Sequence, residues 1–204
     1  MGVGGPVNRV SGGLESLNCD GRRGLTLVGV CVALLLPTLW GDAARLALRY
    51  DRTALAAGQF WRLLSAHVVH LNLRHALVNV LGLALLWALF ARDYCARQWL
   101  VIVAACVLAI DAGLWLLDST VQWYVGSSGV LHGILAAGTL AQLRRGHPEG
   151  WVLALLLAGK LLYEHFAGPL PFSGSAPVIV SAHVFGVLGG AAAALALRIK
   201  PLPL

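Results

Sequence analysis

The amino-acid sequence predicts an all-α protein that crosses a membrane several times. Of its 204 residues, 58% are hydrophobic and only 12% are charged, and the mean hydropathy is +0.77. Soluble domains usually carry about twice that charged fraction. A helix needs roughly 20 apolar residues to cross the hydrocarbon core, and the chain is long enough for several such helices in one domain.

Six apolar segments are predicted to span the membrane: Leu25–Trp40, Val68–Phe90, Gln98–Leu117, Ser128–Leu143, Trp151–Phe166 and Val178–Leu197. The first and the fourth are short for a complete crossing. We expect the first helix to lengthen beyond Trp40 and the fourth to begin below the membrane surface. Non-helical backbone at that depth is tolerated only where it is buried in protein or lines a wet cavity. Ser128 would then lie at the floor of a hydrated pocket.

Basic residues predict the orientation of these segments. The connections on the side of the N-terminus hold Arg9, Arg22, Arg23, Arg92, Arg97, Arg144, Arg145, Arg198 and Lys200. The opposite side holds Arg45, Arg49, Arg52 and Arg62, all in one connection. Because positively charged loops stay in the cytoplasm, both termini are predicted to be cytoplasmic and the pocket at Ser128 to open outside. The net charge of +6 follows from this distribution, so no nucleic-acid partner is needed to explain it.

Two segments differ from the apolar spans. Residues 1–24 are rich in Gly, Ser and Arg and are predicted to form a disordered cytoplasmic tail, which leaves residues 25–200 as one six-helix domain. The stretch Gly41–Phe60 mixes apolar residues with three arginines, and this composition suits a segment that lies in the outer membrane interface.

No cofactor or metal ion is predicted. The cysteines form no CxxC pair; they are Cys19, Cys31, Cys95 and Cys106. His67 and His70 have the i, i+3 spacing of a metal pair, but no third ligand stands beside them in the sequence. We therefore expect both histidines to cap the mouth of the second span.

A serine and a histidine at membrane depth are the first candidates for chemistry. Ser128 lies within Gly126-Ser127-Ser128-Gly129 at the start of one apolar segment, and His183 lies within another. Polar groups are costly in a bilayer and are functional candidates there. A serine becomes a strong nucleophile when an adjacent base takes its proton. The pair predicts an intramembrane serine protease.

Glycines at four-residue spacing could bring these two segments together. Gly129 and Gly133 repeat on the fourth span, and Gly186 and Gly190 on the sixth. Such small-xxx-small faces allow two helices to approach closely, whether for catalysis or for ordinary packing.

His75 and Asn79 are four residues apart and share one helix face. An N–H group from each could point at a developing oxyanion. Asn79 alone would be explained by hydrogen bonding between helices. In combination with the serine motif, we favour the oxyanion role for the pair.

These motifs together resemble the rhomboid family of intramembrane serine proteases. The resemblance runs in order from Gly58 to Gly190: Gly58-Gln59-Phe60-Trp61-Arg62-Leu63, then His70, His75 and Asn79, then GxSG, then Ala182-His183-Val184-Phe185-Gly186-Val187-Leu188-Gly189-Gly190. It implies a six-helix rhomboid-like bundle.

The resemblance also implies a role for each site residue. Ser128 would be the nucleophile and His183 the general base. The oxyanion donors would be His75, Asn79 and the backbone N–H of Ser128. No aspartate joins the pair in this family, so the resemblance implies a Ser-His dyad. Trp61 and Arg62 would belong to the first external loop.

His132 points to one subfamily within the rhomboids. Rhomboids commonly carry an aromatic residue four positions after the serine, but the motif here reads GxSGxLHG. This is similar to the rhombosortase subfamily, whose members process proteins with a C-terminal Gly-Gly motif, a membrane helix and a basic tail. It implies such substrates here, and a bacterial inner membrane with the site opening to the periplasm. Two roles are open for His132, a second base or a residue that orients His183, and we favour the orienting role.

Lys160 and Glu164 lie four residues apart inside the fifth span, and two interpretations stay open. They could form a buried ion pair, because an unpaired charge would be very costly there. They could instead line the substrate entrance, because the fifth span flanks the gate in rhomboids. Asp111, inside the third span, is expected to accept hydrogen bonds from a neighbouring helix.

Two other function classes compete with the protease. The first is an inactive rhomboid-like protein that binds membrane helices, although such relatives usually lack the serine or the histidine. The second is a metal or proton transporter that uses His67, His70, Asp111 and Glu164. The chain lacks the internal repeat that is expected of many transporters.

Overall fold

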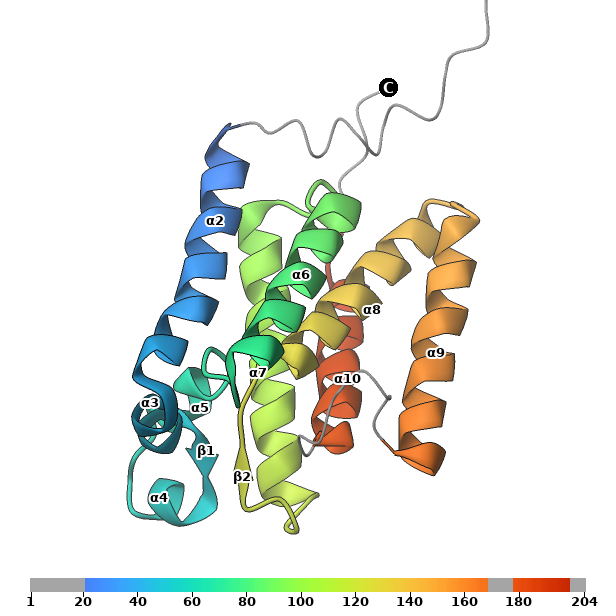
Figure 1. Ribbon diagram of the computed structural model, residues 1–204. Coiled ribbons are helices and arrows are strands. Elements are labelled where there is room, and N and C mark those ends of the chain that lie inside the picture. Colours follow the sequence, from blue (N-terminus) through green and yellow to red (C-terminus); the bar gives the residue numbers. More distant parts are fainter. Residues whose placement is uncertain (1–20, 169–177, 199–204) are drawn as a thin grey trace, which may run out of the picture.

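The computed structural model describes residues 21–168 and 178–198, and they fold into a bundle of helices (Figure 1). Residues 1–20, most of the predicted tail, lie outside the described residues, and helix α2 begins at Gly21. The first half of the chain contains α2 (Gly21–Leu35), η1 (Leu36–Trp40), α3 (Gly41–Leu48), β1 (Tyr50–Asp51), α4 (Arg52–Ala56), α5 (Arg62–Ser65) and α6 (Leu73–Phe90). The second half contains α7 (Ala96–Leu116), β2 (Trp123–Tyr124), α8 (Ser128–Arg144), α9 (Glu149–Ala167) and α10 (Val180–Ala196).

Among the described residues, four helices are long and apolar enough to cross a membrane: Gly24–Leu48, Leu73–Phe90, Ala96–Leu116 and Glu149–Ala167. Helix α10 is apolar but shorter, and α8 has 17 residues. The helical, membrane-spanning class is therefore supported. The count of six spans stays a prediction.

The first helix continues beyond Trp40, as the sequence predicted. Helical structure runs from Gly24 to Leu48. It changes to a 3₁₀ turn where Pro37 enters, because proline removes a backbone donor and crowds the preceding turn.

Helix α6 begins five residues later than the predicted start at Val68, because Asn72 caps it. The Asn72 side chain accepts a hydrogen bond from the His75 N–H at 2.9 Å. Such a cap satisfies one of the donors left free at a helix start. The residues before the cap form turns that carry His67 and His70, and both histidines are buried.

The connection between α3 and α6 is held by Arg62. Its buried side chain donates to Gln59 Oε1 at 2.8 Å and to the carbonyl oxygens of Leu46 and Arg49, both at 2.9 Å. Trp61 beside it is exposed. Both residues therefore lie in the connection that the resemblance implied, where Arg62 ties the end of α3 to the following turns.

Helix α8 starts inside the bundle. The short β1–β2 ladder pairs Tyr50 with Tyr124, and the chain then rises through buried residues 124–127 before α8 begins halfway up (Figure 1). The fourth span was expected to start below the membrane surface. That stays a prediction, and the start of α8 inside the bundle supports it.

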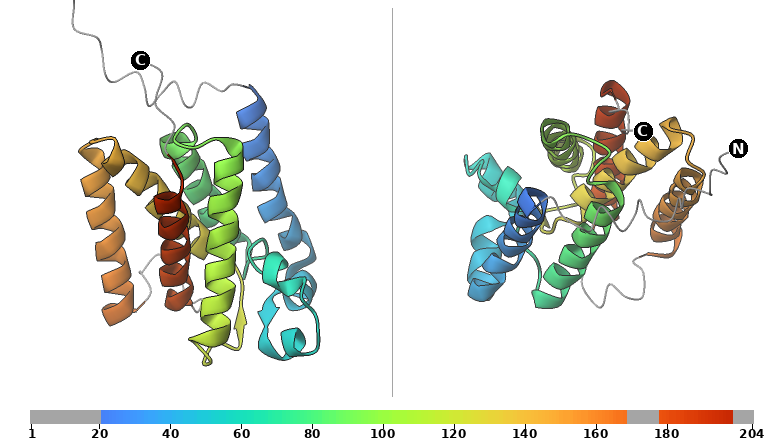
Figure 2. Two further views of the ribbon diagram at one scale, coloured as in Figure 1. Left: turned by 180° about the vertical axis from the view of Figure 1, so that it is seen from behind. Right: turned by 90° about the horizontal axis from the view of Figure 1, so that it is seen from above.

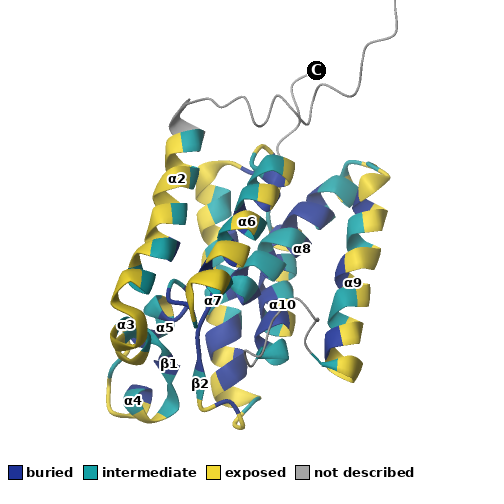
Figure 3. Cartoon of the chain, in the orientation of Figure 1, coloured by how far each residue is buried: buried dark blue, intermediate teal, exposed yellow. Residues whose placement is uncertain are grey.

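Helix α8 is also the best-covered helix among the described residues, because it contacts α6, α7, α9 and α10. Helices α2 and α9 lie on opposite sides of the bundle (Figure 2). Burial is concentrated on α8, α10 and the inner face of α7, and exposed residues follow the outer faces of α2 and α9 (Figure 3). Large apolar side chains are among those exposed, such as Leu108 at 69% and Leu155 at 72%. An outer surface of this kind fits a lipid environment.

Candidate active site

Ser128 is the first residue of α8, and the chain before it is fixed at three points. The Gly126 N–H donates to the Ala66 carbonyl at 2.8 Å, and the Tyr124 hydroxyl donates to the Gly126 carbonyl at 2.6 Å. The Ser127 hydroxyl lies 3.2 Å from His70 Nε2. Ser128 is therefore presented at a defined position, and its backbone N–H, like the other N–H groups of the first turn, has no partner within the helix.

Gly126 is required by the backbone at this point. Its φ of +117° lies in a region that side chains rarely adopt. A Cβ atom at Gly126 would also lie 2.9 Å from Cε1 of His75. The glycine thus allows the His75 ring to lie against the chain two residues before Ser128.

His183 meets Ser128 from α10. The distance from Ser128 Oγ to His183 Nε2 is 3.0 Å. The contact that the sequence predicted between the fourth and sixth apolar segments is therefore present, and His183 is buried, with 4% exposure.

Glycines make this approach possible. A Cβ at Gly129 would lie 2.8 Å from the Ala182 carbonyl oxygen. Cβ atoms at Gly186 and Gly190 would overlap with the carbonyl groups of Gly129 and Gly133. Two backbones can pack this closely only where neither carries a side chain.

Glu164 lies on the other side of His183. Its Oε2 is 2.8 Å from His183 Nδ1, and its Oε1 is 2.6 Å from Lys160 Nζ. Glu164 is buried, with 4% exposure, while the Lys160 side chain is 29% exposed. The buried ion pair, one of the two interpretations from the sequence, is therefore present. The resemblance implied a Ser-His pair without an aspartate, and the structure places a glutamate against His183 Nδ1.

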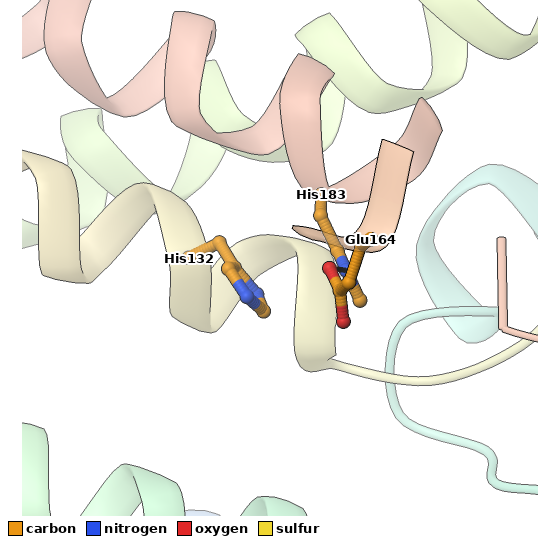
Figure 4. A group of neighbouring side chains, drawn as sticks. All are labelled: His132, Glu164 and His183. Atoms are coloured by element: carbon orange, nitrogen blue, oxygen red, sulfur yellow. Dashed lines mark hydrogen bonds and ion pairs between the residues drawn. The ribbon is translucent and has the colours of Figure 1, made fainter. Parts of the chain in front are cut away.

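His132 packs against the face of His183. The two rings are stacked, with centroids 4.0 Å apart and planes 16° apart. The Nδ1 atom of His132 lies 2.7 Å from the Ser128 carbonyl oxygen, and since that oxygen can only accept, Nδ1–H donates. His132, Glu164 and His183 thus converge from three helices, α8, α9 and α10 (Figure 4).

Comparison with known protein families decides the class of this site. Residues 57–200, well over half of the chain, match the model of the Rhomboid domain. The chain belongs to the rhomboid family. Rhomboids are serine intramembrane proteases, and together with the apolar helices this membership indicates an integral membrane protein. No curated protein matched the chain.

In this rhomboid, the two predicted oxyanion donors lie on α6. The Leu71 N–H approaches His75 Nδ1 at 3.5 Å, so the ring can present Nε2–H toward Gly126. Asn79 is buried and donates one amide hydrogen to the His75 carbonyl at 2.8 Å. The amide has a second hydrogen to offer.

The remaining predicted groups lie apart from Ser128 and His183. His67 Nε2 is 3.3 Å from Asp111 Oδ1, so Asp111 accepts from the turn before α6. His70 contacts Ser127 and meets the His75 ring edge-on at 5.1 Å. His67 therefore ties this turn to α7, and His70 contacts the chain just before Ser128. Both were expected to cap the second span, but the cap of α6 is Asn72.

Three side chains are close enough together to raise the question of a metal ion. The ligand atoms of His132, Glu164 and His183 lie within 4.8 Å of one another. Imidazole binds a metal along its ring plane at about 2.0–2.1 Å. Stacked, nearly parallel rings direct their nitrogen lone pairs side by side, and Lys160 already places a cation on Glu164. The donor set therefore does not fit a metal ion.

The contact between Glu164 and His183 was missed at the sequence level, although a signal was present. A buried carboxylate needs more than one partner, and Lys160 at i−4 satisfies only one oxygen. The second partner could have been sought among the histidines of the other spans. The contact between Ser127 and His70 had no comparable signal.

Proposed function

We propose that this rhomboid is an active intramembrane serine endopeptidase, with Ser128 as nucleophile and His183 as general base. The observation that carries the proposal is the 3.0 Å contact between Ser128 Oγ and His183 Nε2. The carboxylate of Glu164 can only accept, so His183 Nδ1 carries the proton and Nε2 offers its lone pair to the serine hydroxyl.

Cleavage then follows from these groups. Ser128 Oγ attacks the carbonyl carbon of the scissile peptide, and its proton passes to His183 Nε2. The resulting oxyanion is held by N–H groups of Ser128, His75 and Asn79. When the C–N bond breaks, Nε2–H protonates the leaving amine. Water attacks the ester on Ser128 with its proton taken by His183, and the proton returns to Oγ when the C–O bond breaks.

The alternative is an inactive rhomboid-like protein that binds membrane helices. Both reactive side chains are present and in contact, which favours the enzyme. The transporter hypothesis has less support, because Asp111 is paired with His67 and Glu164 with Lys160.

For the topology, we propose six spans with both termini in the cytoplasm of a bacterium and the protein in the inner membrane. The starts of α2, α7 and α9 and the ends of α6, α8 and α10 lie at one end of the bundle, which is the end richer in arginine (Figure 1). The positive-inside rule places that end in the cytoplasm. Ser128 would then be reached from the periplasm, with lipid around the outer faces.

For the substrate, we propose membrane proteins with a C-terminal Gly-Gly sorting tail, as in rhombosortases. The motif GxSGxLHG supports this. So does the stacking of His132 on His183, because His132 is the residue that distinguishes this motif from that of most rhomboids. Glycine next to the scissile bond suits a protease that must unwind a helix, because glycine stabilises a helix least among residues other than proline.

A covalent serine probe tests the proposed nucleophile. Detergent-solubilised protein should be labelled by a fluorophosphonate, and Ser128→Ala should abolish both labelling and cleavage. His183→Ala should be nearly as severe, and the double variant no worse than either, because the two residues act as a unit.

Ser127→Ala is the matched control, because it removes the neighbouring hydroxyl and leaves Ser128 in place. It should still be labelled. Labelling that survives Ser128→Ala but is lost in Ser127→Ala would assign the nucleophile to Ser127 instead.

A further inference from the structure

Glu164 is a buried acidic group in contact with the site, and both of its oxygens are hydrogen-bonded. One accepts from His183 Nδ1–H at 2.8 Å and the other from Lys160 Nζ at 2.6 Å. A buried carboxylate is costly unless it is paired and hydrogen-bonded. A pair with Lys160 alone would satisfy one oxygen, so the contact with His183 requires its own explanation.

The position of Glu164 matches the requirement of the histidine. A general base must present one nitrogen as an acceptor, and a hydrogen bond to the other nitrogen sets which one this is. Glu164 holds the proton on Nδ1, which leaves Nε2 directed at Ser128 Oγ, 3.0 Å away. His132 restrains the same ring by stacking on its face. The carboxylate thus restrains rotation of the His183 ring within its plane, and the stacked ring of His132 restrains its tilt.

We propose that Glu164 is a positioning residue of the reaction, and that Lys160 acts through it by orienting its carboxylate. This rests on the proposed protease function. The site then works as a serine–histidine–glutamate triad in which the acid stabilises the imidazolium that forms when Ser128 attacks. The acid comes from α9, while the nucleophile and the base come from α8 and α10.

Glu164→Gln is the direct test, because the amide keeps the size and can place a donor against Nδ1. In the full-length protein in detergent, kcat should fall by roughly 10²-fold or more, because the wrong tautomer is favoured, as happens when the triad aspartate of a serine protease is replaced by asparagine. The KM should stay unchanged, because the substitution touches no substrate. Glu164→Asp keeps the carboxylate and should restore much of the turnover.

Lys160 gives the second measurement. Lys160→Met should lower kcat several-fold with KM unchanged, and should have no further effect in a Glu164→Gln background, because it acts through that carboxylate. Glu149→Gln is the matched control for Glu164→Gln, since it also replaces a glutamate by glutamine, but at an exposed position at the start of α9. It should leave kcat unchanged.

The outcomes separate the two proposals. If the wild-type protein shows no Ser128-dependent labelling or cleavage, the proposed function fails. If it does, and Glu164→Gln keeps the wild-type kcat or changes KM alone, the positioning role is overturned. Should Glu164→Gln fail to fold, Lys160→Met decides, because its side chain is partly exposed; an unchanged kcat then overturns the proposal.

Discussion

At the scale of single residues, the proposed oxyanion position depends on His75 and Asn79. Both side chains come from α6, and the His75 carbonyl already accepts one hydrogen of the Asn79 amide. That bond orients the amide, so that its second hydrogen points in a fixed direction. Preorganised donors of this kind act mainly when charge develops in the transition state.

Asn79→Ala should therefore lower kcat by roughly 10²-fold with little change in KM, as for other lost oxyanion donors. Steady-state cleavage of a membrane-anchored substrate measures both constants. Retained fluorophosphonate labelling would show that the variant is folded. A raised KM with normal kcat would instead assign Asn79 to helix packing or substrate binding.

Ser128 and His183 could be found from the sequence because polar residues stand out in apolar segments. The contact of Glu164 could not be found in the same way. The sequence shows that Lys160 and Glu164 share a face of α9, but which helix that face meets depends on how α9 lies against α10. The apolar pattern of neither helix carries this information. The one signal, the second oxygen of a buried carboxylate, left open which histidine would be its partner.

At the scale of helices, the contact of α8 with α10 sets the geometry of the site. Gly129 and Gly133 on α8 face Gly186 and Gly190 on α10, with backbone against backbone. Glycine inside a helix is unfavourable relative to alanine by about 0.5–1 kcal/mol. The close contact between the helices offsets that cost.

Gly186→Ala should destabilise the protein by about 1–3 kcal/mol, the range for an overpacked core, because its methyl group would overlap with the Gly129 carbonyl. It should also reduce cleavage by separating Ser128 from His183. Thermal unfolding in detergent measures the first effect.

Gly29→Ala on α2 is the control, because nothing lies within 4 Å of a Cβ there. It should leave stability unchanged or slightly raised. Equal stability of both variants would mean that α8 and α10 do not depend on the glycine contact.

Helix positions followed from the sequence more closely than helix starts. All six apolar segments correspond to helices in the described residues, because apolar composition decides where a helix can lie in a bilayer. The start of α6 was wrong by five residues, because the capping side chain of Asn72 outweighs the apolar character of Val68 and Val69.

At the scale of the whole molecule, the site lies at the start of α8, inside the bundle and set back from the end that carries β1 and β2 (Figure 1). With that end outside the cytoplasm, the scissile bond would lie near the outer end of a substrate helix. The region of a Gly-Gly tail is suited to this position, because it needs little work to unwind.

Replacing the Gly-Gly of a tailed substrate by Leu-Leu should strongly reduce its cleavage in cells that express this rhomboid. Immunoblotting of full-length and cleaved substrate in the same cells measures the effect, with the Ser128→Ala protein as the background. Equal cleavage of both substrates would reject the rhombosortase specificity and leave the rhomboid protease standing.

The fixing of α9 to the bundle has a mechanical consequence. Gly150, at the start of α9, packs closely against Leu143: a Cβ atom added at Gly150 would lie 2.9–3.0 Å from Leu143 atoms. Glu164 contacts His183 near the other end of the helix. At 1.5 Å per residue, Glu164 lies about 21 Å along the helix from that anchor. If α9 tilted by about 5° about Gly150, the carboxylate would move by roughly 2 Å over that length. The contact between Ser128 and His183 is made by α8 and α10 alone. A tilt of α9 would therefore withdraw the acid without separating the nucleophile from the base.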